Sequence, residues 1–331
     1  RPGSRLSGFW LSLCSPTVTE IAAGSGIDWL LLDMEHAPND LSQITDHLRA
    51  ATSAAPDAQM VVRMPSSDQT MTKRLLDIGV QNLMFPMIQN AEDARRAVTW
   101  TRYPPEGLRG ISATIRANNY ARQTDYLSTY TDAQCVIVQV ETPEAVDQIP
   151  AIAAVAGVDA IFIGPGDLSS AMGHTGNPMH PDVQDKIREA VDAIHAAGLP
   201  AGILGYGADL ARRYFDNGIE FVAIAGDAWL LTRQMDALVQ TMARPSPTLT
   251  QQTHKDDVVV CDASYVSGWG AIYYTVRKAG RVILTPRGSA GLGFALPAAI
   301  GASIARPNQR IIVLAGDGGL SYSLGELATI V

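Results

Sequence analysis

Two carboxylates and an imidazole follow three leucines in the segment Leu30-Leu-Leu-Asp-Met-Glu-His-Ala-Pro38. An apolar run that ends abruptly in polar residues is typical of a buried parallel strand that delivers side chains to a site. His36 can act as a general base near neutral pH, and a carboxylate such as Asp33 can orient its ring. A solvated polar loop and a structural histidine are the alternatives that these residues leave open.

Two further acidic residues end later apolar runs. Glu141 follows Gln139-Val140, and Asp167 follows Gly164-Pro-Gly. Two hard oxygen ligands from neighbouring strands suit Mg2+ or Mn2+, with the remaining positions left to water and substrate. Alternatively, each is a carboxylate stabilised by the start of a helix. The free N–H groups of the same glycine-containing turn can bind an anion beside this metal.

A buried arginine is expected at the end of a third run. Arg63 can hold a substrate carboxylate or carbonyl oxygen with its forked donors. The alternative is an ion pair with Asp33, Glu35 or Asp77. A Schiff-base mechanism needs a desolvated lysine, and none of the four lysines ends an apolar run: Lys73, Lys186, Lys255 and Lys278. Carbanion chemistry would therefore rely on the metal.

Short apolar runs and helical patterns must position these side chains. Alternation of mostly apolar strands with helices predicts parallel pairing with helices outside, and eight such units suit an α/β fold, the (β/α)8 TIM barrel, better than a doubly wound sheet. The expected strands are 8–13, 28–33, 60–64, 82–86, 135–141, 159–164, 200–204 and 219–225. Catalytic groups of such barrels lie at the carboxyl ends of the strands, which is where the polar residues fall.

A proline-bearing polar stretch divides the chain. We expect the barrel over residues 1–243, a linker over 244–257, and a partial α/β segment over 258–331. Further strands are expected at 258–261, 282–285 and 311–315. The chain opens without Met, so its native start is expected to differ.

Composition excludes several classes of function. The net charge is −8 with no basic patch, so we expect no nucleic-acid partner, and no apolar run is long enough to span a membrane. Three scattered cysteines indicate a reducing compartment, hence the cytoplasm: Cys14, Cys135 and Cys261.

The sequence resembles the HpcH/HpaI aldolase family of class II, metal-dependent pyruvate aldolases over about residues 5–243. The matching motifs are Gly8-Phe-Trp-Leu, Leu32-Asp-Met-Glu-His-Ala-Pro, Val62-Arg-Met-Pro, Leu76-Asp-Ile-Gly-Val-Gln, Phe85-Pro-Met-Ile-Gln-Asn-Ala, Tyr103-Pro-Pro-Glu-Gly-Leu-Arg-Gly, Gln139-Val-Glu-Thr, Ile163-Gly-Pro-Gly-Asp-Leu-Ser and Ala225-Gly-Asp. The resemblance implies a carbon–carbon lyase that reversibly cleaves 4-hydroxy-2-oxoacids to pyruvate and an aldehyde. A related lyase or decarboxylase acting on an oxaloacetate-like acid is the alternative.

The resemblance also implies roles for individual residues. Glu141 and Asp167 would hold Mg2+, Mn2+ or Co2+. His36 would be the base, working through a water with Asp33 as its partner, and Arg63 would stabilise the enolate oxygen.

Other implied roles concern the substrate and the assembly. The backbone N–H groups of Gly166 and Asp167 would bind the pyruvate carboxylate, while Trp10 and Leu204 would line the aldehyde side. Asp77 would approach a site in a neighbouring subunit. Members of this family assemble as hexamers, trimers of dimers that exchange a C-terminal helix, here about residues 229–242.

The last part of the chain is similar to the C-terminal domain of thiamine-diphosphate enzymes of the acetolactate synthase type. The matching motifs are Gly291-Leu-Gly-Phe-Ala-Leu-Pro-Ala-Ala-Ile-Gly-Ala and Val313-Leu-Ala-Gly-Asp-Gly-Gly. In that family Asp317 would bind Mg2+ on the diphosphate. The sequence ends before the position where an Asn-Asn pair would follow, and Leu292 replaces a common Met, so we expect no productive thiamine diphosphate binding and no thiamine-dependent carboligase activity.

Overall fold

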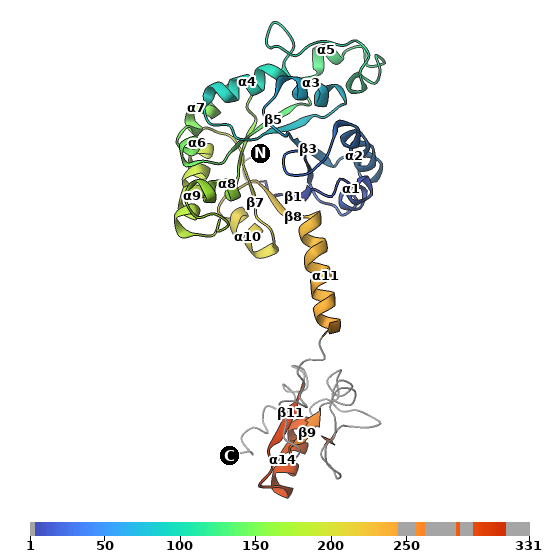
Figure 1. Cartoon of the computed structure of the whole chain (residues 1–331), viewed down its shortest axis with the longest axis vertical. Coiled ribbons are helices and arrows are strands. Elements are labelled where there is room, and N and C mark those ends of the chain that lie inside the picture. Colours follow the sequence, from blue (N-terminus) through green and yellow to red (C-terminus); the bar gives the residue numbers. More distant parts are fainter. Residues whose placement is uncertain (1–3, 244–255, 262–282, 285–293, 316–331) are drawn as a thin grey trace. The chain divides into compact units, whose positions relative to one another are not determined.

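A closed barrel of eight parallel strands forms most of the computed structural model (Figure 1). The model describes residues 4–243, 256–261, 283–284 and 294–315. The strands are β1 (Leu6–Leu11), β2 (Trp29–Asp33), β3 (Gln59–Arg63), β4 (Asn82–Phe85), β5 (Cys135–Val140), β6 (Ala160–Ile163), β7 (Ala201–Leu204) and β8 (Phe221–Gly226). They follow one another around the barrel in sequence order, and β8 closes it by pairing with β1. The predicted TIM barrel is confirmed.

Helices pack around the outside of these strands (Figure 1). They are α1 (Pro16–Ala23), α2 (Leu41–Ala54), α3 (Gln69–Asp77), α4 (Ala91–Thr101), α5 (Tyr126–Thr129), α6 (Pro143–Asp147), α7 (Ile149–Ala153), α8 (Pro165–Ala171), α9 (Pro181–Ala196) and α10 (Ala208–Asp216), with a 3-10 turn η1 (Arg116–Asn118). Helix α11 (Asp227–Ala243) follows β8, and most of its residues are exposed. Side-chain oxygens accept hydrogen bonds from first-turn N–H groups in several of the outer helices, at the N-caps Ser15, Asp40, Asp68, Asn90 and Thr142. These caps begin the helices directly after the strand-end loops.

Two apolar layers explain why the strands are hydrophobic on both faces. Leu30 and Leu32 of β2 pack outward with the helices, whereas Leu31 points into the barrel interior with Trp29 and Phe162. Alternate residues of a strand point to opposite faces, so a strand buried on both sides has no polar face. This burial accounts for the continuous apolar runs in the sequence.

The chain divides into two compact units, residues 1–233 and 234–331, so the boundary falls within α11. In the second unit β9 (Val258–Cys261) lies between β10 (Ile283–Leu284) and β11 (Ile311–Leu314) in a parallel sheet, and α14 (Ala295–Ala305) packs against it. The expected linker lies outside the described residues up to position 255. None of the helices in the described parts is long and apolar enough to cross a bilayer.

Candidate active site

The carboxyl ends of β2 and β3 place Asp33 directly beside Arg63. The two residues are paired in the register of these strands. The guanidinium donates from Nε to Asp33 Oδ1 at 3.0 Å and from Nη2 to Asp33 Oδ2 at 2.7 Å. Both side chains are buried, and a forked arginine–carboxylate pair satisfies both charges at once. The ion-pair alternative for Arg63 is therefore present in the structure.

Trp10 and Glu35 also contact this ion pair. The indole of Trp10 donates to Asp33 Oδ2 at 3.2 Å, and its ring lies 4.8 Å from the Arg63 guanidinium carbon. Glu35 Oε2 lies 2.9 Å from Arg63 Nη1, without the geometry of a hydrogen bond. Burial alone would raise the pKa of Asp33, but the hydrogen bonds and charge of Arg63 lower it below its usual value. Asp33 is therefore a fixed anion that holds Arg63 in place.

The prediction that Asp33 orients the ring of His36 is wrong, because the two side chains do not contact each other in the structure. Asp33 Oδ1 accepts hydrogen bonds from the backbone N–H groups of Glu35 and His36, and Arg63 and Trp10 take its remaining capacity. The His36 ring is 66% exposed and lies 4.0 Å from Glu35 Oε2. The carboxylate nearest to the imidazole is thus Glu35, and the loop after β2 carries His36 at the surface of the barrel mouth.

Glu141 follows β5 and is almost completely buried, with 1% of its surface exposed. Its Oε1 accepts the backbone N–H of Met87 at 2.9 Å, and its Oε2 accepts from Gln139 Nε2 at 2.7 Å. Burial raises the pKa of Glu141 to about 7, with further contributions from the negative charges of Asp167 and Glu35. Thr142, not Glu141, caps helix α6, so the helix-start alternative does not explain this carboxylate.

Gly164 leaves the space that Glu141 occupies. A Cβ atom at this glycine would lie 2.2 Å from Glu141 Oε2. Asp167, in the first turn of α8, is exposed, as is Gly166, and its charge acts on both Glu141 and Glu35. The start of α8 therefore places a second carboxylate within electrostatic range of the buried one.

The charges at this mouth do not balance within the described residues. Asp33 and Glu35 lie against the Arg63 guanidinium, and the charges of Glu35 and Asp167 both act on Glu141. Asp33 is matched by Arg63 through two hydrogen bonds, whereas Glu141 has no ion-pair partner among the described residues. A buried acid with a pKa raised to about 7 is only partly ionised at neutral pH, and a nearby cation would favour its ionised form. The donor set, hard oxygens on neighbouring elements, fits a divalent metal ion such as Mg2+ or Mn2+.

Comparison with known proteins agrees with this arrangement. The sequence model of the HpcH/HpaI aldolase/citrate lyase family matches residues 6–233. A protein of Klebsiella pneumoniae named 4-hydroxy-2-oxo-heptane-1,7-dioate aldolase is 48% identical over 244 residues, which cover 73% of this chain and 91% of that protein. The chain belongs to the HpcH/HpaI aldolase/citrate lyase family.

Solved structures of this family share the barrel. An HpcH/HpaI aldolase/citrate lyase family protein from Burkholderia cenocepacia is 39% identical, with a TM-score of 0.71 over 73% of this chain and 96% of that one. The HpcH/HpaI aldolase of Desulfitobacterium hafniense is 30% identical, with a TM-score of 0.68 over 74% and 95%. Residues 262–331 match a second model, the thiamine pyrophosphate enzyme C-terminal TPP binding domain. Asp317 and Leu292 lie outside the described residues.

Asp77, which the family resemblance assigns to a site in a neighbouring subunit, does not lie with the other predicted site residues. It ends α3 and forms a 2.8 Å ion pair with Arg109, whose side chain is fully buried. Arg109 also donates to the hydroxyl of Tyr126 at 3.2 Å. Because α3 runs away from the carboxyl end of β3, its last residue lies toward the opposite end of the barrel from Arg63. Within this chain Asp77 does not join the cluster around Glu141.

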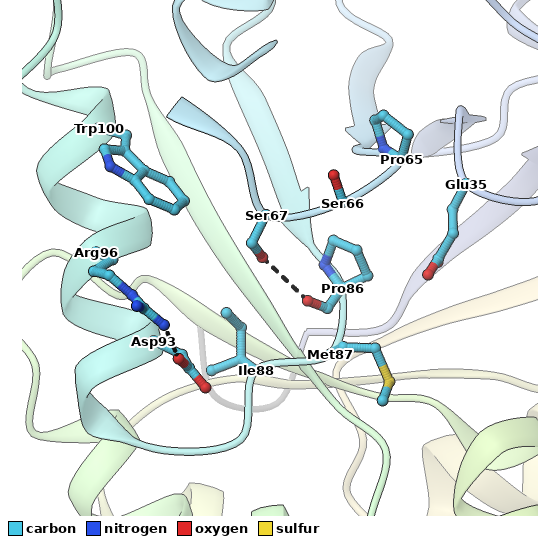
Figure 2. A pocket seen from close by; sticks show the side chains of 10 residues that line it. All are labelled: Glu35, Pro65, Ser66, Ser67, Pro86, Met87, Ile88, Asp93, Arg96 and Trp100. Atoms are coloured by element: carbon cyan, nitrogen blue, oxygen red, sulfur yellow. Dashed lines mark hydrogen bonds and ion pairs between the residues drawn. The ribbon is translucent and has the colours of Figure 1, made fainter. Parts of the chain in front are cut away.

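The two residues expected on the aldehyde side belong to the packed interior. Trp10 is 4% exposed and lies under Arg63, while Leu204 at the end of β7 is half-buried and packs in the same apolar cluster. A cavity of about 480 Å³ opens elsewhere on the mouth, beside Glu35 (Figure 2). The loops after β3 and β4 line it, with Ser66, Ser67, Met87 and Trp100 among its residues.

The sequence contains no signal for the Met87 contact and none for the place of Glu35 beside His36, and it offers only a weak signal for Gln139. Gln139 is 3% exposed, donates to Glu141, and leaves its own Oε1 without a hydrogen-bond partner. Met87 turns its backbone N–H to Glu141 with a left-handed φ of 54°. Glu35 supplies the carboxylate next to His36. A polar residue inside an otherwise apolar strand was the available signal for Gln139, whereas nothing in the sequence marks the backbone of Met87.

Proposed function

We propose that this chain is a metal-dependent aldolase that cleaves 4-hydroxy-2-oxoacids reversibly to pyruvate and an aldehyde. The observation that carries the proposal is the buried Glu141, whose pKa is raised to about 7 by burial and by the negative charges of Asp167 and Glu35. Family membership and the names of the curated relatives support the same carbon–carbon lyase chemistry. The substrate of those relatives, 4-hydroxy-2-oxoheptane-1,7-dioate, is the first compound to test.

Glu141 and Asp167 would hold the divalent ion, as Mg2+, Mn2+ or Co2+. A cation at that position polarises the keto group of the substrate and offsets the negative charge that bond cleavage creates. The backbone N–H groups of Gly166 and Asp167 open the first turn of α8 and bind the carboxylate of the oxoacid.

The chain's own side chains perform the proton and charge steps. His36, exposed at the mouth, accepts the proton of the 4-hydroxyl through a water as the C3–C4 bond breaks. The bonding electrons move onto the pyruvate fragment as an enolate. Arg63 has N–H groups left after binding Asp33 and donates them to the enolate oxygen, in a geometry already fixed by Trp10 and Asp33.

Pyruvate release tests the proposal directly. Metal-depleted protein is assayed with 4-hydroxy-2-oxoheptane-1,7-dioate and with oxaloacetate, with Mg2+ or Mn2+ and with excess chelator. We expect metal-dependent turnover that E141A abolishes. The matched control is E144A, which removes an exposed carboxylate three positions along the chain. Turnover in chelator, or full activity of E141A, would contradict the metal assignment, and faster release from oxaloacetate would favour a decarboxylase.

We also propose that the enzyme assembles as a homo-hexamer, a trimer of dimers. Helix α11 carries large apolar side chains at spacings of three and four residues, and all are more than half exposed: Leu231, Met235, Leu238, Val239 and Met242. One apolar face on a helix of this length is suited to burial against another chain. A second copy that exchanges this helix is the occupant we propose, and L238E is expected to reduce the mass measured by light scattering.

Subunit mixing tests whether neighbours share a site. If Asp77 serves the site of a neighbouring subunit, E141A and D77N are each inactive alone. Mixed oligomers then regain part of the activity, because some sites receive both intact residues. No recovery after mixing would assign Asp77 to its ion pair with Arg109 alone. The free cysteines favour a reducing location, and we place the enzyme in the cytoplasm, with small-molecule substrates and copies of itself as partners.

A further inference from the structure

A second group of metal-ligating side chains lies between α8 and α9, apart from the catalytic carboxylates. One ligand atom from each of His174, His180 and Asp182 lies within 4.8 Å of the other two. The Nε2 atom of His174 is 3.5 Å from Asp182 Oδ2, and the Nδ1 atom of His180 is 3.7 Å from the same oxygen. We propose that these three residues form a binding site for a borderline divalent ion of the Zn2+ type.

The separations fit a shared ion better than direct hydrogen bonds. A good N–H···O bond has a donor–acceptor distance of about 2.7–3.2 Å, which both histidine–aspartate contacts exceed. A tetrahedral ion with bonds of about 2.0–2.1 Å separates neighbouring ligand atoms by about 3.4 Å. The carboxylate of Asp182 therefore already stands at nearly the distance from each imidazole nitrogen that a shared ion requires.

The backbone that carries these ligands is held by its own hydrogen bonds. The N–H of His174 donates to the carbonyl of Ser169 in α8 at 2.7 Å, and the N–H of Asn177 donates to the carbonyl of His174 at 2.8 Å. The N–H of His180 closes the loop onto Asn177 at 3.1 Å. His180 is also the N-cap of α9, which fixes its position relative to Asp182 in the first turn. A preformed backbone lowers the ordering cost of binding.

The two imidazoles have room to adjust. Their rings stack with centroids 3.6 Å apart and planes 13° apart, and their side chains are 27% and 33% exposed. Rotation about the terminal side-chain torsion is soft, so the rings can splay until both lone pairs point at one ion. The Nδ1 of His180 accepts only a 3.3 Å bond from the N–H of Asp182, which an ion can replace. Water would complete the coordination on the exposed side.

Ligand chemistry separates this site from the catalytic one. Two imidazole nitrogens and a single carboxylate favour Zn2+, Ni2+ or Cu2+ over Mg2+, whereas the oxygen-only set at Glu141 and Asp167 suits Mg2+ or Mn2+. The proposal does not rest on the proposed aldolase reaction, because it concerns residues outside that cluster. It predicts a chain that holds one more Zn2+ than its catalytic site accounts for.

Zinc stoichiometry tests the proposal. The full chain is stripped of metal, dialysed against buffered Zn2+, and its zinc is counted by mass spectrometry. We expect the double variant H174A/H180A to bind one Zn2+ fewer per chain than the wild type. The control H195A removes a histidine of α9 whose Nε2 lies 3.2 Å from Glu220 Oε2, and it should keep the wild-type count. Equal zinc in the wild type and the double variant would overturn the proposal.

Two further readouts guard against a folding artefact. Circular dichroism and Mg2+-dependent pyruvate release of H174A/H180A should match the wild type.

D182N keeps both histidines and should weaken Zn2+ binding at least tenfold. With Co2+ as probe, we expect the visible absorption of a nitrogen-ligated, low-coordination site in the wild type and in H195A. If the same absorption persists in H174A/H180A and in D182N, the nitrogen ligands lie elsewhere and the assignment fails.

Discussion

Metal affinity should depend on pH in a way that Glu141 sets. The pKa of this buried acid is raised to about 7, and a metal ion can bind only its ionised form. About one tenth of the carboxyl is ionised at pH 6 and about nine tenths at pH 8, so the apparent affinity for Mn2+ should rise about tenfold between them. A tenfold change corresponds to about 1.4 kcal/mol of binding free energy.

Calorimetry measures both the affinity and the proton. Mn2+ is titrated into metal-free protein at pH 6, 7 and 8, in two buffers that differ in ionisation enthalpy. Nearly one proton per ion should be released at pH 6 and about a tenth of one at pH 8. E144A should keep this profile, since Glu144 is exposed in the first turn of α6, whereas E141Q should bind weakly at every pH. A wild-type affinity that stays constant from pH 6 to 8, without proton release, would refute the reasoning.

The same ionisation has a cost in the metal-free fold. The folded state holds the Glu141 proton more tightly than the unfolded state, whose pKa is near 4.5, so stability falls as the pH rises between 4.5 and about 7. The difference between the pKa values of the two states, at about 1.4 kcal/mol per pH unit, gives a loss of at most about 3 kcal/mol of unfolding free energy. No further loss is expected above pH 7. Chemical denaturation with and without Mn2+ should show the loss only in the metal-free protein.

Three further predictions concern the residues that hold the site. G164A places a methyl group 2.2 Å from Glu141 Oε2, which must retreat by about 1 Å, so turnover should fall about 100-fold, while G24A, whose nearest contact is 3.5 Å away, should retain it. R63A strands the buried carboxylate of Asp33 and should cost about 3–5 kcal/mol of unfolding free energy by urea titration; a loss below about 1 kcal/mol would contradict the pairing. The pKa of Asp33 is lowered, so its stabilising contribution is present above pH 3.8 and disappears as the pH falls through the lower folded value; D33N should flatten that acid limb of the stability curve.

The barrel was predictable because its strands are buried on both faces, and such strands appear in the sequence as short apolar runs. The predicted and observed strands differ by one or two residues at their ends, as at β1, which begins at Leu6 instead of position 8. Strand ends depend on pairing with a neighbour, and the first residues of β1 pair with β8, the last strand of the barrel. The order of polar residues at the strand ends likewise followed from the rule that one end of the barrel carries the chemistry.

The contacts within the site were only partly predictable. The pairing of Arg63 with Asp33 depends on the register of β2 and β3, which the sequence left as one of several alternatives. Arg63 binds both oxygens of Asp33, so Asp33 has no free hydrogen-bonding capacity for the His36 ring. The predicted Asp33–His36 pair is therefore replaced by the forked Asp33–Arg63 pair. The backbone N–H of Met87 reaches Glu141 through a left-handed turn, and turn geometry of this kind leaves no pattern in side-chain types.

Anomalous diffraction from crystals soaked in Mn2+ and pyruvate tests the central claim most directly. The account predicts a single strong manganese peak between the carboxylates of Glu141 and Asp167, with pyruvate oxygens in contact with the ion. It also predicts that this peak vanishes in E141A crystals treated in the same way. A peak that persists in E141A, or manganese that avoids the barrel mouth in the wild type, would contradict the account.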